Sequence, residues 1–134
     1  MFLLDSNACI RILNNSSSAL VARLREHNPG DIFLCSVVKA ELIYGAYHST
    51  RPADNLRVLE KFFEPFASLP FDDPCSLVYG RMRSDLANLG TPIGPNDLMI
   101  AAIALINKLT LVSANTTEFG RVPGLSLENW EVVE

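Results

Sequence analysis

Four carboxylates are spread along the chain at positions where they could carry out chemistry together. They are Asp5, Glu41, Asp97 and Glu118. Carboxylates that lie close together repel one another, so one of them must take up a proton or a cation must lie between them. Oxygen ligands without Cys or His suit a hard cation such as Mg²⁺ or Mn²⁺, and such sites activate water and stabilise charge on phosphoryl oxygens. If these side chains meet, we expect a divalent-metal site.

Asp5 follows an apolar run at residues 2–4, which is too short for a helix and is predicted to be a buried first strand. Ser6 and Asn7 are good helix-starting residues, so Asp5 is expected at the carboxyl end of that strand. In open α/β sheets, functional sites form just beyond the carboxyl ends of the strands. The alternative is that Asp5 only caps the helix that follows it.

Glu41 lies in a predicted helix at residues 37–48, and its neighbours in sequence are the apolar residues Ala40, Leu42 and Ile43. A glutamate is rarely buried completely unless a partner compensates its charge. This placement favours a functional role for Glu41. The alternative is a helix that is only half-buried, with Glu41 reaching water.

Asp97 lies in the first turn of a predicted helix at residues 96–107, where the helix dipole alone would favour an anion. Apolar residues follow it at intervals of three, four, seven and eight, namely Ile100, Ala101, Ala104 and Leu105. Asp97 therefore belongs to the helix face that packs on the sheet, at the rim that looks toward Asp5. The stiff loop at residues 91–95 fixes this end of the helix.

Glu118 follows a predicted strand at residues 110–113 and lies in a short helical turn at residues 115–120. Asn115 and Glu118 have the spacing of a capping box, in which the first residue caps the helix and the fourth reaches back. A structural and a functional role for Glu118 are both open.

The elements that must position these acids alternate along the chain. Short apolar strands are predicted at 2–4, 32–36, 68–71, 110–113 and 127–132, and helices from residue 6 and at 17–27, 37–48, 53–66, 73–89 and 96–107. A turn is predicted at residues 28–31. This alternation predicts an α/β fold with a mostly parallel sheet of four to five strands, flanked by helices.

The composition is that of an ordinary globular protein. The chain has 134 residues, of which 49% are hydrophobic and 19% charged, which fits a single domain over residues 1–134 and excludes a disordered chain. No apolar run approaches the roughly 18 residues that a membrane span needs. The amino terminus has neither the basic stretch nor the cleavage site of a signal peptide, so we expect a cytoplasmic protein without membrane contact.

The cysteines and histidines offer no metal or redox site of their own. Cys9, Cys35 and Cys75 are widely spaced, odd in number and without a C-x-x-C motif, so we expect buried or half-buried reduced thiols. His27 and His48 have no partner at metal-ligand spacing and are expected at the surface or as satisfied core residues.

Several segments resemble the PIN domain and, more narrowly, the VapC ribonuclease toxins of bacterial toxin–antitoxin pairs. The segments are Leu4-Asp5-Ser6-Asn7, Ala40-Glu41-Leu42 with Tyr44-Gly45, Thr91-Pro92-Ile93-Gly94-Pro95-Asn96-Asp97-Leu98-Met99-Ile100-Ala101-Ala102, Leu111-Val112-Ser113-Ala114-Asn115 with Glu118-Phe119, and the tail Val122-Pro123-Gly124-Leu125 with Glu128-Asn129-Trp130. The resemblance covers essentially the whole chain, and its segment around Asp97 is the most specific.

The resemblance implies a PIN-like three-layer fold and an endoribonuclease toxin that depends on Mg²⁺ or Mn²⁺. Asp5 and Asp97 would be the principal metal ligands, Glu41 would complete the acidic pocket, and Glu118 would be the fourth acid. The substrate would be a structured loop of transfer or ribosomal RNA, and the products a 5′-phosphate and a 3′-hydroxyl. A homodimer and a small cognate VapB-like antitoxin that blocks the cleft would be the protein partners.

Three neighbouring residues would support these acids, and two of them depart from the family pattern. Ser6 stands where the family usually has Thr, and it keeps the hydroxyl that positions a ligand. Asn7 is the residue that the family usually has at this position. Asn115 stands where many members have Asp, and a neutral amide is a weaker ligand. This change puts a second metal site in doubt or moves its carboxylate to Glu118.

The net charge of −4 argues against a nucleic-acid partner when it is taken alone. Of the 15 acidic residues, however, four are the candidate site acids, and the other 11 balance the 11 Lys and Arg residues. The arginines that could line a path for RNA are Arg11, Arg51, Arg81 and Arg83, and a solvated charged face is the alternative for each. Without a strongly basic stripe, we expect weak non-specific binding and recognition of RNA by shape.

Two rival functions belong to other classes. A catalytically silent PIN-like protein would hold the antitoxin or RNA without cutting, and Asn115 is the feature that supports it. A phosphatase would use Asp5 as the nucleophile, but the second Asp expected two positions later is Asn7 here. Nucleotide-binding motifs of the G-x-x-x-x-G-K-[ST] or G-x-G-x-x-G type do not occur.

Overall fold

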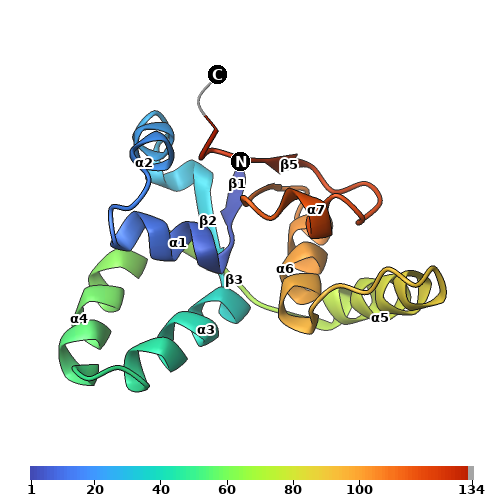
Figure 1. Cartoon of the computed structure of the whole chain (residues 1–134), viewed down its shortest axis with the longest axis horizontal. Helices are drawn as coiled ribbons and strands as arrows, with labels where there is room; N and C mark the ends of the chain where they lie inside the picture. The colour runs from blue at the N-terminus through green and yellow to red at the C-terminus, as the bar shows by residue number, and fades with distance from the viewer. Residues whose placement is uncertain (133–134) are drawn as a thin grey trace.

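Five short strands form one parallel sheet in the computed structural model, which describes residues 1–132 (Figure 1). The strands are β1 (Phe2–Leu4), β2 (Ile32–Cys35), β3 (Ala67–Leu69), β4 (Thr110–Val112) and β5 (Leu127–Glu128). Their order across the sheet is β3-β2-β1-β4-β5, and every neighbouring pair is parallel. The predicted sheet is confirmed, and within the described residues its strands are all parallel rather than mostly so.

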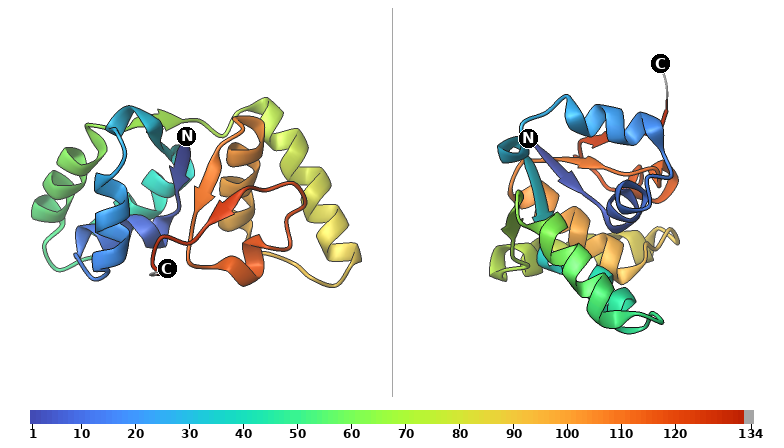
Figure 2. Two further views of the ribbon diagram at one scale, coloured as in Figure 1. Left: turned by 90° about the horizontal axis from the view of Figure 1, so that it is seen from above. Right: turned by 90° about the vertical axis from the view of Figure 1, so that its left-hand side faces the viewer.

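Helices cover both sides of this sheet. They are α1 (Ser6–Leu13), α2 (Ser18–Arg25), α3 (Ser36–Tyr47), α4 (Pro52–Phe63), α5 (Asp73–Asn88), α6 (Pro95–Ile106) and α7 (Thr116–Phe119), with a 3₁₀ turn, η1, at Pro29–Asp31. In Figures 1 and 2, α1 to α4 lie to one side of the central strands and α5 to α7 to the other. This confirms the predicted three-layer α/β fold.

The central strand β1 is the point where the chain reverses its direction across the sheet. The first three strands run outward from β1 to β3, and the chain then returns to place β4 on the other side of β1. Such a reversal is where α/β sheets usually form a binding crevice, at the carboxyl ends of the strands. Asp5 follows β1 directly, so it lies at this crevice.

The helix that carries Asp97 is the most buried helix of the fold. From Ile100 to Ala104 the side chains of α6 are wholly buried, as is Leu98 in its first turn. A helix that is apolar on all sides must be covered on all sides, and α6 lies between β4 and α5, which both contact it. Its first turn therefore emerges from the core at the rim of the sheet, with Asp97 half-buried there.

The predicted last strand at residues 127–132 is wrong beyond Glu128. The side chain of Asn129 accepts a hydrogen bond from the backbone N–H of Glu131 at 3.0 Å, which closes a turn in place of an extended strand. Trp130, which the predicted strand would carry, is only 1% exposed because its side chain packs into the core from this turn. A turn thus buries this side chain without a strand.

Other boundaries differ from the predicted ones by a few residues. Ser36 begins α3 instead of ending β2, and α4 stops at Phe63 instead of residue 66. The three cysteines are free and buried, as expected. Over residues 1–132 no helix combines the length and apolar character that crossing a membrane requires.

Candidate functional site

Asp5 is a helix cap and a buried acid at the same time. Its Oδ1 accepts a hydrogen bond from the backbone N–H of Ala8 at 2.8 Å, and its residue is 3% exposed. Burial raises the pKa of Asp5, hydrogen bonds from the Ser113 side chain and from Ala8 oppose that rise, and the charges of Glu131 and Glu41 add to it. The capping and functional roles do not exclude each other, because capping takes only one of the two carboxylate oxygens.

Ser113 is a site residue that the sequence patterns did not single out. Leu4 of β1 pairs with Val112 of β4, so Asp5 and Ser113 lie side by side at the carboxyl ends of neighbouring strands. Ser113 is 1% exposed, and its Oγ also accepts the backbone N–H of Asn115 at 2.9 Å. A hydroxyl directly after a buried apolar strand was the available indication, and only the strand order connects it to Asp5.

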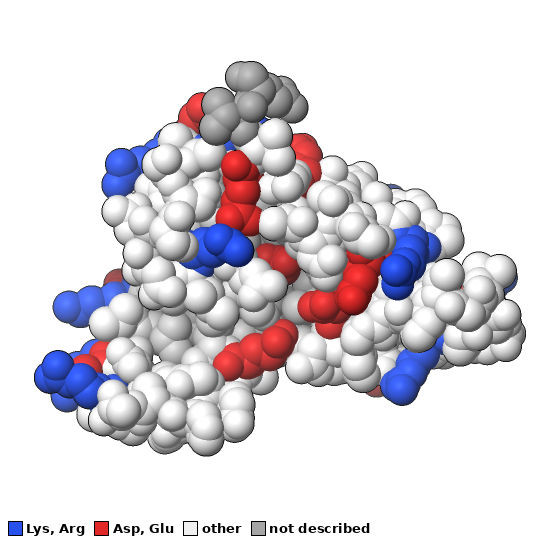
Figure 3. Space-filling view, viewed as in Figure 1, with Lys and Arg blue, Asp and Glu red and all other residues white. Residues whose placement is uncertain are grey.

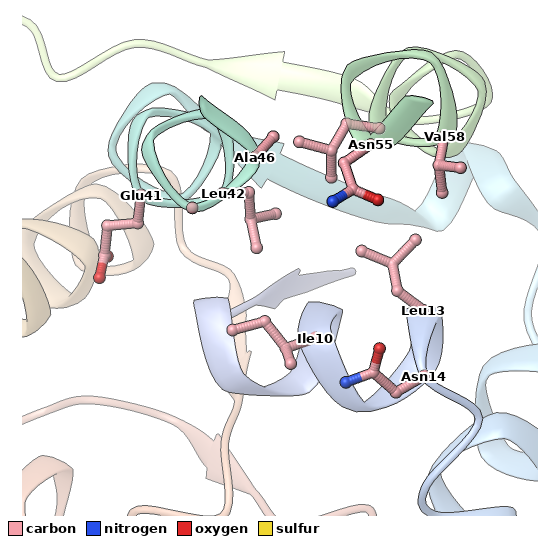
Figure 4. A pocket seen from close by; sticks show the side chains of 10 residues that line it. Ile10, Leu13, Asn14, Glu41, Leu42, Ala46, Asn55 and Val58 are labelled. Atoms are coloured by element: carbon pink, nitrogen blue, oxygen red, sulfur yellow. The ribbon is translucent and has the colours of Figure 1, made fainter. Parts of the chain in front are cut away.

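Glu41 is held toward β1 by a hydrogen bond between two helices. The Oγ of Ser6 donates to Oε1 of Glu41 at 2.8 Å, which joins the first turn of α1 to α3. Glu41 is half-buried, and it lines a pocket of about 470 Å³ that lies between α1, α3 and α4. Figure 4 shows Glu41 at one end of this pocket, with apolar side chains such as Ile10 and Leu42 along the rest of it.

Asp97 connects the four acids electrostatically. Burial raises the pKa of Asp97 to about 6, and the charges of Asp5, Glu41 and Glu118 all add to the rise. These three acids come from the end of β1, from α3 and from α7. The fold therefore brings Asp5, Glu41 and Glu118 within electrostatic reach of Asp97.

The predicted capping box at Asn115 and Glu118 is only half formed. Asn115 caps α7, since its Oδ1 accepts the Glu118 backbone N–H at 3.5 Å. The reciprocal bond is absent because the Asn115 backbone N–H goes to Ser113 instead. The Glu118 carboxylate takes its hydrogen bond from Nδ2 of Asn115, at 3.4 Å. A neutral amide at position 115 thus supports Glu118 in a way that an aspartate could not.

The other predicted residues lie around this cluster or away from it. Asn7 is exposed in the first turn of α1. Arg51 pairs with Asp54 at 2.9 Å and Arg83 donates to the Tyr79 hydroxyl at 2.7 Å. In Figure 3, acidic side chains gather across the middle of the face, whereas most basic side chains lie at its periphery.

The oxygen donors of the four acids and their neighbours fit a hard divalent cation. The acid side chains are, however, not arranged around a common point where such an ion would lie. Every candidate ligand is a carboxylate, hydroxyl or amide oxygen, which is the set that Mg²⁺ and Mn²⁺ prefer. Across residues 1–132, no three His, Cys, Asp or Glu side chains form a group that could hold a metal ion as they stand. Three of the four acids are instead held by hydrogen bonds from Ala8, Ser6 and Asn115.

Comparison with known proteins gives consistent matches over almost the whole chain. The PIN domain family matches residues 2–125. The tRNA(fMet)-specific endonuclease VapC of Shigella flexneri is 40% identical over 96% of this chain and 97% of its own length. Ribonuclease VapC2 of Rickettsia felis is 35% identical over 98% of both chains. The crystal structure of DNA-bound VapBC from Salmonella typhimurium superposes with a TM-score of 0.90 at 37% identity, covering 96% of this chain and 97% of that one.

Proposed function

The chain belongs to the PIN-domain family and, within it, to the VapC ribonucleases, and we propose that it hydrolyses phosphodiester bonds in structured RNA with the help of Mg²⁺ or Mn²⁺. It is an endoribonuclease toxin that a VapB-like antitoxin neutralises. Its RNA substrate is a loop of a transfer or ribosomal RNA, in line with the transfer-RNA specificity in the name of its Shigella flexneri relative. Such a substrate implies action in the cytoplasm.

One observation carries the metal-dependent part of this proposal. The pKa of Asp97 is raised to about 6 by burial and by three further acids. Keeping several carboxylates ionised at one crevice destabilises the fold unless a cation compensates them. A divalent cation between them would remove this repulsion, and it would supply the positive charge that stabilises phosphoryl oxygens during hydrolysis.

In this proposal each acid has its own task. Asp5 and Asp97 would hold the cation, since they lie at the end of β1 and in the first turn of α6. Glu41, aligned by Ser6, would complete the acidic pocket. Glu118, aligned by Asn115, would orient the water that attacks phosphorus in line. Cleavage leaves a 5′-phosphate and a 3′-hydroxyl.

The decisive experiment is cleavage of a mixed bacterial transfer-RNA pool and of ribosomal RNA by the purified protein. We expect cleavage with Mg²⁺ or Mn²⁺, none in excess EDTA, and a loss of more than about a hundred-fold in Asp97→Asn, since a lost ligand charge costs several kcal/mol at the transition state. Asp85→Asn is the matched control, because Asp85 is exposed on α5. Full activity of Asp97→Asn, or activity in EDTA, would refute the metal mechanism.

The identity of the RNA follows from sequencing RNA ends after induced expression in cells. A single dominant cut within one structured loop is expected, together with suppression of the cut by co-expressed antitoxin. Binding of RNA without any cleavage in either assay would instead support the silent binding protein. We also propose that the toxin is a homodimer, which light scattering of the purified protein tests.

A further inference from the structure

An ion pair joins the last turn of α1 to the carboxyl-terminal tail. The Nε atom of Arg11 lies 3.0 Å from Oε1 of Glu131. The Glu131 side chain is 17% exposed and the Arg11 side chain 49% exposed. The carboxylate is therefore the fixed, mostly buried partner, and the guanidinium is the partner that faces water.

The tail that presents Glu131 is anchored by the residues that directly precede Glu131. Trp130 is 1% exposed, and its ring lies 5.0 Å from that of Phe2 and 5.1 Å from that of His27. Its Nε1 donates to Glu128 at 3.0 Å, and the Glu131 N–H donates to Asn129. Because the backbone is held in this way, Glu131 loses little conformational freedom when it pairs with Arg11.

This ion pair lies at the edge of the acid site. Burial raises the pKa of Asp5, and the charge of the nearby Glu131 carboxylate adds to this rise. Asp5 caps α1, and Asn7 and Arg11 are four residues apart on that helix, so they share one exposed face. The face of α1 that leads away from Asp5 thus carries an exposed guanidinium that Glu131 holds in place.

The other arginines that could have lined an RNA path are engaged elsewhere. Arg51, which directly precedes α4, pairs with Asp54 of that helix, and Arg83 contacts Tyr79 within α5. Arg81 lines a separate pocket beside α5 with Arg121. Arg11 is the one of the four that is linked to the acid site, through Glu131.

The geometry at Arg11 suits a phosphate. An RNA chain that enters an acidic crevice is repelled by it, so a cation beside the crevice is needed to hold the neighbouring phosphates. An arginine that uses Nε for a protein carboxylate still has the N–H groups of both terminal nitrogens for a second acceptor. Its planar fork matches the two free oxygens of a phosphodiester.

We propose that Arg11, positioned by Glu131, binds an RNA phosphate next to the one that is cleaved. This inference rests on the proposed ribonuclease function. Arg11 is then a substrate-binding residue and Glu131 a positioning residue, and the ion pair supplies cationic contact on a surface that has no basic stripe.

The test compares Arg11→Ala and Arg11→Lys with wild type in steady-state cleavage of the mixed transfer-RNA pool. We expect KM to rise about ten-fold in Arg11→Ala with kcat nearly unchanged, as for the loss of binding shared by ground and transition states. Arg11→Lys keeps the charge but not the fork and should recover part of the loss. Arg57→Ala is the control, because it removes the same charge from an exposed residue of α4. The Arg57 guanidinium lies 3.8 Å from the Asp54 carboxylate. Equal KM in Arg11→Ala and Arg57→Ala would overturn the proposal.

Binding measurements in EDTA separate this proposal from the ribonuclease function. The slope of log affinity against log salt concentration should fall by about 0.7 to 0.9 in Arg11→Ala, as for one lost phosphate contact. An unchanged slope would overturn the role of Arg11 even in an active enzyme. If wild type cleaves no RNA, the proposed function fails, whereas a changed slope would still support the phosphate contact.

The role of Glu131 is tested by combining substitutions. Glu131→Gln should raise KM about three-fold alone and have no further effect in the Arg11→Ala background, because the two residues would act as one unit. Thermal melting of each variant checks that the fold is intact. Full additivity of the two KM effects would exclude positioning of Arg11 by Glu131.

Discussion

Two neighbouring regions of this molecule are built on opposite electrostatic principles. The acid site gathers Asp5, Glu41, Asp97 and Glu118, where burial and the charges of the other three acids raise the pKa of Asp97 to about 6. The tail anchor, which we define as Phe2, Arg23, His27, Glu128 and Trp130, contains only contacts that attract. Glu131, which directly follows Trp130, links the two regions because its charge acts on Asp5 of the acid site.

The tail anchor is a stack of complementary groups. The Arg23 guanidinium lies 5.4 Å from the centre of the Trp130 ring and 3.3 Å from the Glu128 carboxylate, which also accepts the indole N–H. The His27 ring stacks on the Trp130 ring, with an angle of 11° between the two rings. The comparison teaches that the contacts of the tail anchor stabilise the fold, whereas repulsion among the four acids lowers its stability, and we propose that a cation compensates for this repulsion.

The largest expected effect comes from removing the centre of the tail anchor. Trp130→Ala should lower the free energy of unfolding by about 3 to 5 kcal/mol, the usual loss for a buried aromatic side chain. Urea unfolding followed by circular dichroism measures this change. Trp130→Phe keeps the apolar ring and should lose clearly less. If Trp130→Ala had the same urea midpoint of unfolding as wild type, the tail anchor would not stabilise the fold.

The second effect is stabilisation of the acid site by its cation. Mg²⁺ at ten times its Kd should raise the free energy of unfolding by about 1.4 kcal/mol, because the ion binds only the folded state. The rise in Tm should be absent in Asp97→Asn and retained in Trp130→Phe. An equal rise in wild type and Asp97→Asn would show that Mg²⁺ acts at another place.

A smaller effect is expected at the rim of the tail anchor. Arg23→Ala should cost about 1 kcal/mol, because it removes a cation–π contact and a partly exposed ion pair. Arg25→Ala, on the same helix but exposed, provides the control with the same change of charge. Equal unfolding curves for the two variants would show that Arg23 adds nothing to stability and that only the aromatic residues of the tail anchor stabilise the fold.

The smallest effect is a pH-dependent gain in stability from Asp97→Asn in the absence of divalent ions. The folded-state pKa of Asp97, about 6, lies above its ordinary value of 3.8, so wild type loses stability as pH rises through this interval. The variant lacks that loss and should melt higher than wild type above pH 6 and equally near pH 3. Solvent screens a half-buried carboxylate, so the gain should stay below about 1 kcal/mol. A gain at low pH that vanished at neutral pH would reverse the sign and contradict this assignment.

The sequence alone could predict those features that depend on local patterns. The apolar run before Asp5 predicted its place at the end of a strand, and the spacing after Asp97 predicted that it faces the sheet. The start of α7 at Asn115 was also predicted, because the capping contact joins residues only three positions apart.

Contacts between distant segments could not be read from such patterns. Ser6 and Glu41 are 35 residues apart, and the contact between Ser113 and Asp5 depends on the order of the strands. The pairing of Arg11 with Glu131 depends on a turn at Asn129, where the sequence patterns predicted a strand instead. In each case the tertiary arrangement decides which polar groups become partners.

The position of β4 in the sheet also makes completion of the site a matter of folding order. β4 (Thr110–Val112) is one of the two neighbours of the central strand β1, although residues 5–109 separate the two strands in the chain. Pairing these strands closes a long loop, which costs conformational entropy and slows folding. Until this pair forms, β1 has one open edge and Asp5 has no Ser113 beside it, so we expect the site to be completed late in folding.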